Sequence, residues 1–167
     1  IQDLITAFSS SLFEGAQLEI VGEGFYQDHL KTLAREYGIA ERVIWRGLAT
    51  PAEVAKIMKS SDILCLPSYT EGSPNVVKEA MSCGLPVVAS AVGGVPELVA
   101  HEERGFLYEA GNVEDLSEKL MLLVRSPSMR QSLGAKGRKK ILESGMDWND
   151  TANEFHMIFQ SVMKVRP

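Results

Sequence analysis

The chain has 167 residues, of which 45% are hydrophobic and 23% charged, and its formal net charge is -5 at pH 7. This length and composition are typical of one globular domain, or slightly more, with a buried core. The negative charge and the lack of a basic block argue against nucleic acid or an anionic lipid surface as the main partner. No run approaches the ~18 apolar residues of a membrane-spanning helix, and no secretion signal is predicted.

The cysteines and histidines argue against disulfide and metal chemistry. Cys65 lies in a strand-like run and Cys83 at a predicted helix end, so both are expected to be buried free thiols in a reducing, cytoplasmic compartment. The three histidines are far apart and show no metal-ligand spacing. The sequence therefore predicts no metal site.

Apolar periodicity predicts helices and strands that alternate along the chain. The first helix is predicted from Leu4 to Leu12, with Gly15 as its stop. The predicted strands are 17–21, 42–46, 63–66, 86–90 and 105–108. The later helices are predicted at 26–37, 50–60 and 73–83, shortly after 93–94, and at 113–124, 128–142 and 148–163. Such alternation with short connections predicts an α/β fold with a parallel sheet covered by helices on both faces, whose ligands bind at the carboxyl ends of the strands.

Two turns along this pattern are informative. Gly22-Glu23-Gly24 follows the first predicted strand, and its glycines permit a tight turn and close approach of a ligand. The third glycine of a dinucleotide fingerprint is absent, which argues against nicotinamide binding. Thr50-Pro51-Ala52-Glu53 has the sequence of a capping box that starts a helix.

The stretch from Glu71 to Met81 concentrates the polar candidates. Ser73 is predicted as the N-cap and Pro74 as the first helical residue. The predicted buried face is formed by Val76, Val77, Ala80 and Met81, with Glu79 on its flank. A helix N-terminus favours phosphate, whereas the carboxylates of Glu71 and Glu79 accept hydrogen bonds from sugar hydroxyls. The combination favours a ligand with both groups; alternatively, the acidic residues only stabilise the helix or lie on a solvated surface.

Two adjacent glycines, Gly93 and Gly94, follow the predicted strand 86–90. Because neither has a side chain, the backbone can approach a ligand closely at this point. A plain turn is the alternative explanation.

Several of these motifs, in this order, resemble the C-terminal, donor-binding domain of retaining glycosyltransferases with the GT-B fold, in family four (glycosyl transferases group 1). The matching segments are 21–24, 43–47, 67–80 with Glu71 and Glu79 in an E-x7-E arrangement, 84–90, 93–94 with Glu97, and 105–107. The resemblance implies a Rossmann-like parallel sheet with helices on both faces. It also implies a nucleotide-diphosphate sugar as donor substrate, with no metal or other cofactor.

The resemblance assigns roles to individual residues. Glu71 is implied at the donor sugar, as the catalytic-site carboxylate, and Glu79 at the ribose hydroxyls. The remaining implied donor-binding residues form two groups. They are the backbone around Gly72, Ser73, Pro74, Asn75 and Val76 at the sugar and diphosphate, and the loops at Gly22, Glu23, Gly24 and Arg46 near the diphosphate and base.

The chain departs from the family pattern at its start. A strand ending in a Gly-Arg pair, a nearby lysine and the N-terminal acceptor-binding domain are not represented, so a fragment with exposed strand edges in the middle of its sheet is expected. Residues 1–147 are predicted to form the nucleotide-sugar-binding domain. Residues 148–167 are predicted as a helix that crosses to the N-terminal domain. The isolated domain is expected to be inactive, and the full-length enzyme to be cytoplasmic or peripheral to a membrane.

The function implied by the resemblance is transfer of a hexose to an acceptor glycan, lipid or small molecule, in polysaccharide or glycolipid synthesis. The alternative is a non-catalytic sugar-nucleotide-binding or interaction module on the same fold. An epimerase acting on a nucleotide sugar is a third, weaker option. The sequence leaves open the sugar, the base, the acceptor and the oligomeric state.

Overall fold

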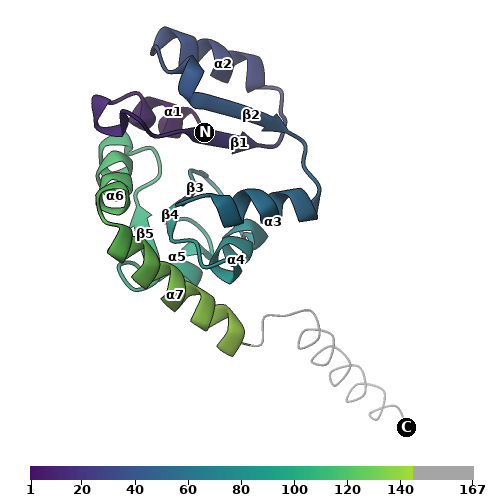
Figure 1. Cartoon of the computed structure of the whole chain (residues 1–167), viewed down its shortest axis with the longest axis vertical. Coiled ribbons are helices and arrows are strands. Elements are labelled where there is room, and N and C mark those ends of the chain that lie inside the picture. Colours follow the sequence, from purple (N-terminus) through teal and green to yellow (C-terminus); the bar gives the residue numbers. More distant parts are fainter. Residues whose placement is uncertain (145–167) are drawn as a thin grey trace.

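The computed structural model describes residues 1–144 as an α/β fold (Figure 1). The strands are β1 (Leu18–Val21), β2 (Val43–Gly47), β3 (Leu64–Leu66), β4 (Val87–Ser90) and β5 (Gly105–Tyr108). The helices are α1 (Gln2–Phe8), α2 (Gln27–Glu36), α3 (Pro51–Ser60), α4 (Asn75–Ser82), α5 (Val95–Val99), α6 (Val113–Arg125) and α7 (Pro127–Glu143), with short 3₁₀ turns η1 (Ser11–Phe13) and η2 (Ala40–Arg42). The predicted helix 148–163 and the predicted segment 148–167 lie outside the described residues.

The strands form two parallel sheets. One pairs β1 with β2, and the other has the order β3-β4-β5. No ladder joins β1 to β3 within residues 1–144, so both are edge strands. The predicted parallel α/β architecture is confirmed. Exposed edges were expected in the middle of the sheet, and the structure places the break between β1-β2 and β3-β4-β5.

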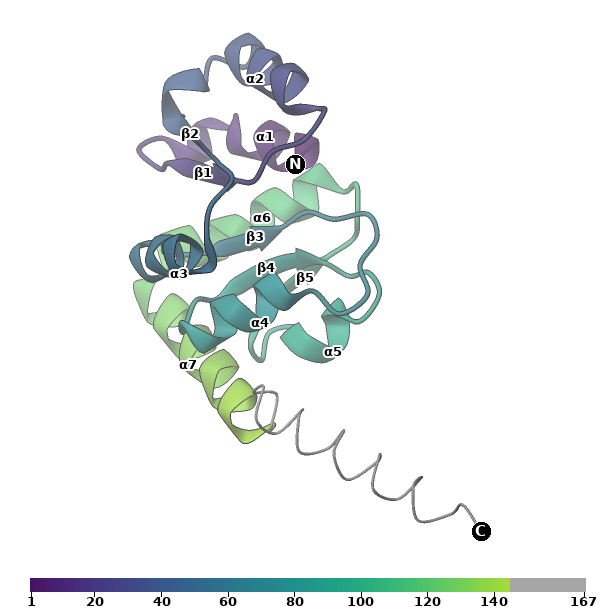
Figure 2. The ribbon, with the colours of Figure 1, turned by 90° about the vertical axis from the view of Figure 1, so that its right-hand side faces the viewer.

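The three-stranded sheet is covered on both faces, and β4 is buried along its whole length. Its side chains alternate between two hydrophobic clusters. Val88 joins a cluster with α1, α2 and α6, whereas Val87 and Ala89 join a second cluster with α3, α4 and α5. Figure 2 shows α4 and α5 on one side of this sheet and α6 behind it.

Among residues 1–144, helices cover only one face of the two-stranded sheet. Leu18 and Ile20 of β1 pack with Val43 and Trp45 of β2 against the cluster that α1 and α2 share. On the opposite face, Val21 is 41% exposed and the side chain of Arg46 is 46% exposed. Helical cover on both faces, as predicted for the whole sheet, is therefore found only around β3, β4 and β5.

The first predicted helix is too long. Helix α1 ends at Phe8, and the Ser10 hydroxyl accepts a hydrogen bond from the Leu12 amide at 3.3 Å, which starts η1. Serine competes in this way with helix propagation. The new direction of the chain leaves Leu12 50% exposed and buries Phe13.

Arg42, the last residue of η2, connects the start of β2 to the N-terminal helical segment. Its Nη1 donates to the Phe13 carbonyl at 2.6 Å and its Nη2 to the Phe8 carbonyl at 3.4 Å. The guanidinium carbon also lies 4.7 Å from the centre of the Phe8 ring. Both carbonyls belong to helix ends, where intrahelical partners are lacking.

Helix α3, which connects the two sheets along the chain, begins with the predicted capping box. The Thr50 hydroxyl accepts from the Glu53 amide at 3.4 Å, and Glu53 Oε2 accepts from the Thr50 amide at 2.7 Å. The hydrogen bond from the Thr50 amide lowers the pKa of Glu53 below its usual value. The start of the connection between the sheets is thus fixed locally.

The cysteines are free thiols, as predicted, although both retain some solvent exposure. Burial raises the pKa of the Cys65 thiol to about 12. In residues 1–144 there is no helix with the length and apolar character that crossing a membrane requires.

Candidate functional site at the carboxyl ends of the strands

The loops that follow β3 and β4 meet at the carboxyl ends of these neighbouring parallel strands. Residues 67–74 form the first loop, which carries Glu71 and leads into α4, and residues 91–94 form the second. Open parallel α/β sheets bind their ligands at this end of the strands. The geometry of the two loops therefore defines the candidate site.

The two loops interlock through the adjacent glycines. The Gly94 amide donates to the Gly72 carbonyl at 2.8 Å. A Cβ on Gly94 would lie 2.6 Å from that carbonyl oxygen, and a Cβ on Gly93, whose φ is +53°, would overlap the Glu71 carbonyl. The close approach predicted for this glycine pair is therefore made to the backbone of the first loop.

Glu71 is half-buried and anchored by its own loop. Its Oε1 accepts a hydrogen bond from the Ser68 hydroxyl at 2.7 Å, and no described residue donates to its Oε2. In the same loop, the Tyr69 hydroxyl donates to Asp3 Oδ2 of α1 at 2.8 Å. That hydrogen bond raises the pKa of Tyr69. The first loop is thus attached both to the core and to α1.

Ser90, the last residue of β4, holds this loop from its buried side. It is 0% exposed and is the one fully buried polar residue of the part of the chain that the structure describes. Its hydroxyl donates to the Ser68 carbonyl at 2.5 Å and lies 3.4 Å from the Leu66 carbonyl. Sequence analysis missed both serines; the available signal was a polar residue that closes the apolar run 86–89.

The start of α4 differs from the prediction by one residue. Pro74, not Ser73, is the N-cap, because its ψ of 118° is extended and the helix begins at Asn75. Ser73 makes no capping hydrogen bond, and the amide of Val77 is bonded to the Pro74 carbonyl at 3.2 Å. The amides of Asn75 and Val76 thus precede the first helical bond, and they can donate to an anion.

The apolar face predicted for α4 is confirmed. Val77, Ala80 and Met81 are buried, and Val76 is half-buried. Glu79 is exposed in the second turn of the helix. Glu71 and Glu79 therefore lie before and after the helix start, as predicted, and their roles toward a ligand stay predictions.

The remaining predicted residues lie in the turn after β1 and in β2. The Gly22 amide donates to the Gly47 carbonyl at 2.7 Å, which fixes the turn that carries Glu23 and Gly24. Arg46 Nε donates to Glu19 Oε2 at 2.9 Å, and this hydrogen bond raises the pKa of Arg46. In residues 1–144 no side-chain hydrogen bond or ion pair connects this group to the Glu71 loop.

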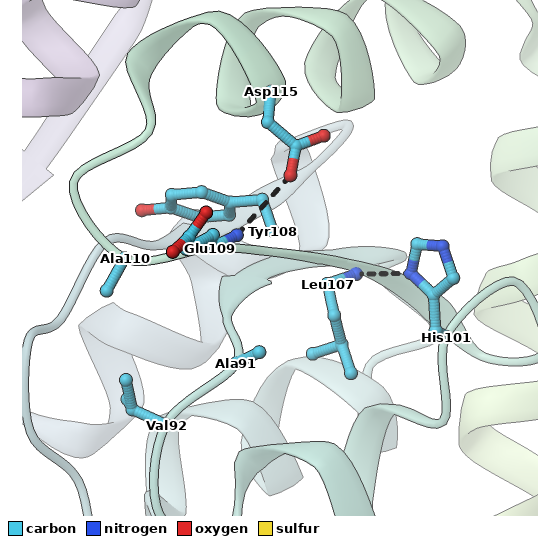
Figure 3. A pocket seen from close by; sticks show the side chains of 8 residues that line it. All are labelled: Ala91, Val92, His101, Leu107, Tyr108, Glu109, Ala110 and Asp115. Carbon is cyan, nitrogen blue, oxygen red and sulfur yellow. Dashed lines mark hydrogen bonds between the residues drawn. The ribbon is translucent and has the colours of Figure 1, made fainter.

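A separate open pocket of about 540 Å³ lies along the edge strand β5 (Figure 3). Its edge amides are already used: Leu107 donates to His101 Nδ1 at 2.9 Å and Glu109 to Asp115 Oδ2 at 3.3 Å. None of the predicted donor-site residues lines it, and its carboxylates disfavour a phosphate. Across residues 1–144 there is also no cluster of three His, Cys, Asp or Glu side chains that could hold a metal.

The sequence matches one protein family over most of its length. The model of that family, glycosyl transferases group 1, matches residues 1–140. The chain belongs to this family. A glycosyltransferase of Haemophilus influenzae is 40% identical over 131 residues, which are 78% of this chain and 36% of that protein. The chain spans less than half the length of such curated relatives.

Solved structures agree on the fold. Sucrose-phosphate synthase from Thermosynechococcus elongatus superposes with a TM-score of 0.92 at 26% identity, over 99% of this chain and 42% of that one. Anabaena HepE in complex with UDP-glucose superposes with a TM-score of 0.76 at 25% identity, over 83% of this chain and 39% of that one. This chain therefore has the fold of the C-terminal half of GT-B enzymes.

Proposed function

We propose that this chain is the donor-binding part of a retaining glycosyltransferase that moves a hexose from a nucleotide-diphosphate sugar to an acceptor. The observation that carries the proposal is the fixed position of Glu71 beside the start of α4. A carboxylate with one oxygen that accepts from no residue of the described part lies next to helix amides that can meet a phosphate. One ligand class, a sugar joined to a diphosphate, satisfies both groups.

In the proposed chemistry, each of these groups contacts a different part of the donor. Glu71 accepts hydrogen bonds from the donor-sugar hydroxyls. The amides of Asn75 and Val76, with the positive end of the α4 dipole, stabilise the negative charge that grows on the departing diphosphate. Glu79, exposed one turn further on, accepts from the ribose hydroxyls.

The turn at Gly22, Glu23 and Gly24 and the strand end at Arg46 are proposed to contact the diphosphate and base. Arg46 retains guanidinium nitrogens beyond the one bonded to Glu19, so it can meet a phosphate without losing that contact. A neighbour of the same fold was solved with UDP-glucose, which supports a nucleotide hexose as the class of donor. No metal or other cofactor is included in the proposal. The acceptor site is proposed to lie in the part of the full-length protein outside this chain.

The test is calorimetric titration of the full-length protein with nucleoside diphosphates and their hexose conjugates. We expect Glu79→Ala to weaken binding of both ligand classes by about tenfold, because a hydrogen bond to a charged group is lost. Glu71→Ala is expected to weaken only the hexose conjugates. Glu36→Ala, an exposed glutamate at the end of α2, is the matched control and should change neither.

Three outcomes would contradict the proposal, in part or as a whole. Unchanged affinity after Glu79→Ala would exclude the ribose contact. Selective binding of a nucleotide sugar without any transfer or hydrolysis by the full-length protein would favour a non-catalytic binding module. Failure of every member of the ligand panel to bind would overturn the donor-site assignment itself.

A further inference from the structure

Glu71 has a carboxylate whose two oxygens have different surroundings. Oε1 accepts from the Ser68 hydroxyl at 2.7 Å, whereas no described residue donates to Oε2. A carboxylate can accept on both oxygens, so one bond leaves full accepting capacity on the other. The Ser68 bond therefore decides which oxygen is available to a ligand.

The backbone of Ser68 is itself fixed by a buried group. The Ser90 hydroxyl reaches from the end of β4 to the Ser68 carbonyl, just beyond the end of β3. Ser90 is fully buried, and a buried hydroxyl without a partner is costly, so this bond is maintained. The Ser68 side chain thus projects from a backbone position set by the core.

The other end of the same loop is fixed independently. The Gly94 amide holds the Gly72 carbonyl at 2.8 Å, and Gly93 packs against the Glu71 carbonyl. Glu71 therefore has a restrained backbone on one side and a restrained hydrogen-bond donor on the other. These backbone contacts do not fix the rotation of the Glu71 carboxylate. The hydrogen bond from the Ser68 hydroxyl restrains that rotation.

We propose that Ser68 is a positioning residue: its hydroxyl holds one oxygen of Glu71 so that the other oxygen faces the donor sugar, with Ser90 as the buried anchor of the arrangement. This inference rests on the proposed function, because it assigns Glu71 to the sugar. It adds two residues, neither of which contacts the ligand through its side chain. Positioning of this kind raises the fraction of molecules in which the Glu71 carboxylate has the orientation that binds the sugar. It contributes nothing where Glu71 is absent.

The experiment is a double-mutant cycle on the full-length protein, with calorimetric titration of a nucleotide hexose and of the nucleoside diphosphate alone. Ser68→Ala is expected to weaken nucleotide-hexose binding about fivefold to tenfold and to change nucleoside-diphosphate binding less than about twofold. In a Glu71→Ala background the same change should have no further effect, because the two groups act as a unit. Ser68→Thr keeps the hydroxyl and should restore the affinity.

Two further variants separate positioning from general loop stability. Ser90→Ala fits the space without strain and should reproduce the selective loss seen with Ser68→Ala. Ser82→Ala removes an exposed hydroxyl of α4 that donates to the Lys78 carbonyl at 2.8 Å, and it is the matched control that should change nothing. Melting temperatures of all variants identify any that are misfolded.

The outcomes distinguish the inference from the proposed function. If Glu71→Ala weakens nucleotide-hexose binding and Ser68→Ala does not, the inference is overturned while the function stands. Equal loss for both ligands, or an undiminished loss in the Glu71→Ala background, would likewise overturn it by showing a structural role. If Glu71→Ala itself has no effect, the assignment of Glu71 fails and this inference fails with it.

Discussion

The two sheets of this chain bury their strands to different extents. In the three-stranded sheet, helices cover both faces and every residue of β4 is buried. In the two-stranded sheet, the helices cover one face, and β1 has no fully buried residue. The contrast shows that a parallel strand is buried along its whole length only where it has cover on both sides.

The same contrast is visible in the order of side chains. In β4 the run Val87-Val88-Ala89 is apolar without interruption, whereas β1 alternates Leu18, Glu19 and Ile20. The polar residue of β1, Glu19, lies on the uncovered face of the sheet, where it forms an ion pair with Arg46. We expect substitutions to have effects that follow this difference in cover.

The largest expected effect is on matched valine-to-threonine changes in the two sheets. Val88→Thr places a hydroxyl at a fully buried position of β4 and should lower the free energy of unfolding by about 2–3 kcal/mol. Val21→Thr, at a 41% exposed position of β1, should change it by less than about 0.5 kcal/mol. Urea unfolding followed by circular dichroism measures both, and similar losses in the two variants would contradict the difference in cover.

A smaller effect is expected at Arg42, which joins β2 to the ends of α1 and η1. Arg42→Met should cost about 1–2 kcal/mol, because the Phe8 carbonyl loses its donor and the Phe13 carbonyl keeps only the Ala16 amide. Hydrogen exchange should accelerate in α1, β1 and β2 more than in β3, β4 and β5. The control is Arg35→Met in α2, whose guanidinium makes one side-chain hydrogen bond within residues 1–144, to the Thr32 hydroxyl at 3.5 Å. Uniform acceleration across both sheets in Arg42→Met would argue against a separate role.

The smallest expected effect concerns the connection between the sheets. The Thr50 amide lowers the pKa of Glu53, so the ionised carboxylate stabilises the folded state. That contribution is fully present above the ordinary pKa of 4.5 and is lost as the pH falls through the lowered value. The melting temperature of Glu53→Gln should therefore lie slightly below that of the natural sequence at pH 7 and equal it at strongly acidic pH. A difference that grows on acidification would have the wrong sign.

Local patterns in the sequence predicted most of the architecture, because they follow from local rules. Strand and helix order, the capping box at Thr50 and the apolar face of α4 all came from periodicity and capping. The errors arose where tertiary contacts or hydrogen bonds competed with the pattern. Leu12 matched the helical period, but the Ser10 hydroxyl ended that helix; Pro74 fitted the first helical position, but its extended backbone made it the N-cap.

The candidate site was predicted only in part. Glu71 and the glycine pair were identified because residue types at a loop suggest chemistry. Ser68 and Ser90 were missed, because their importance depends on a contact between two residues that are 22 positions apart in sequence. Spacing along the chain does not reveal that contact.

The interlocked glycines have a consequence for protein engineering. Since Gly93 and Gly94 fit against the carbonyls of Glu71 and Gly72, the loops after β3 and β4 form one structural unit with complementary backbones. A loop exchange that aims to alter donor preference should therefore transfer segments 67–74 and 91–94 together, with Ser90 beneath them. Moving the first segment alone would place a new backbone against a partner shaped for the old one.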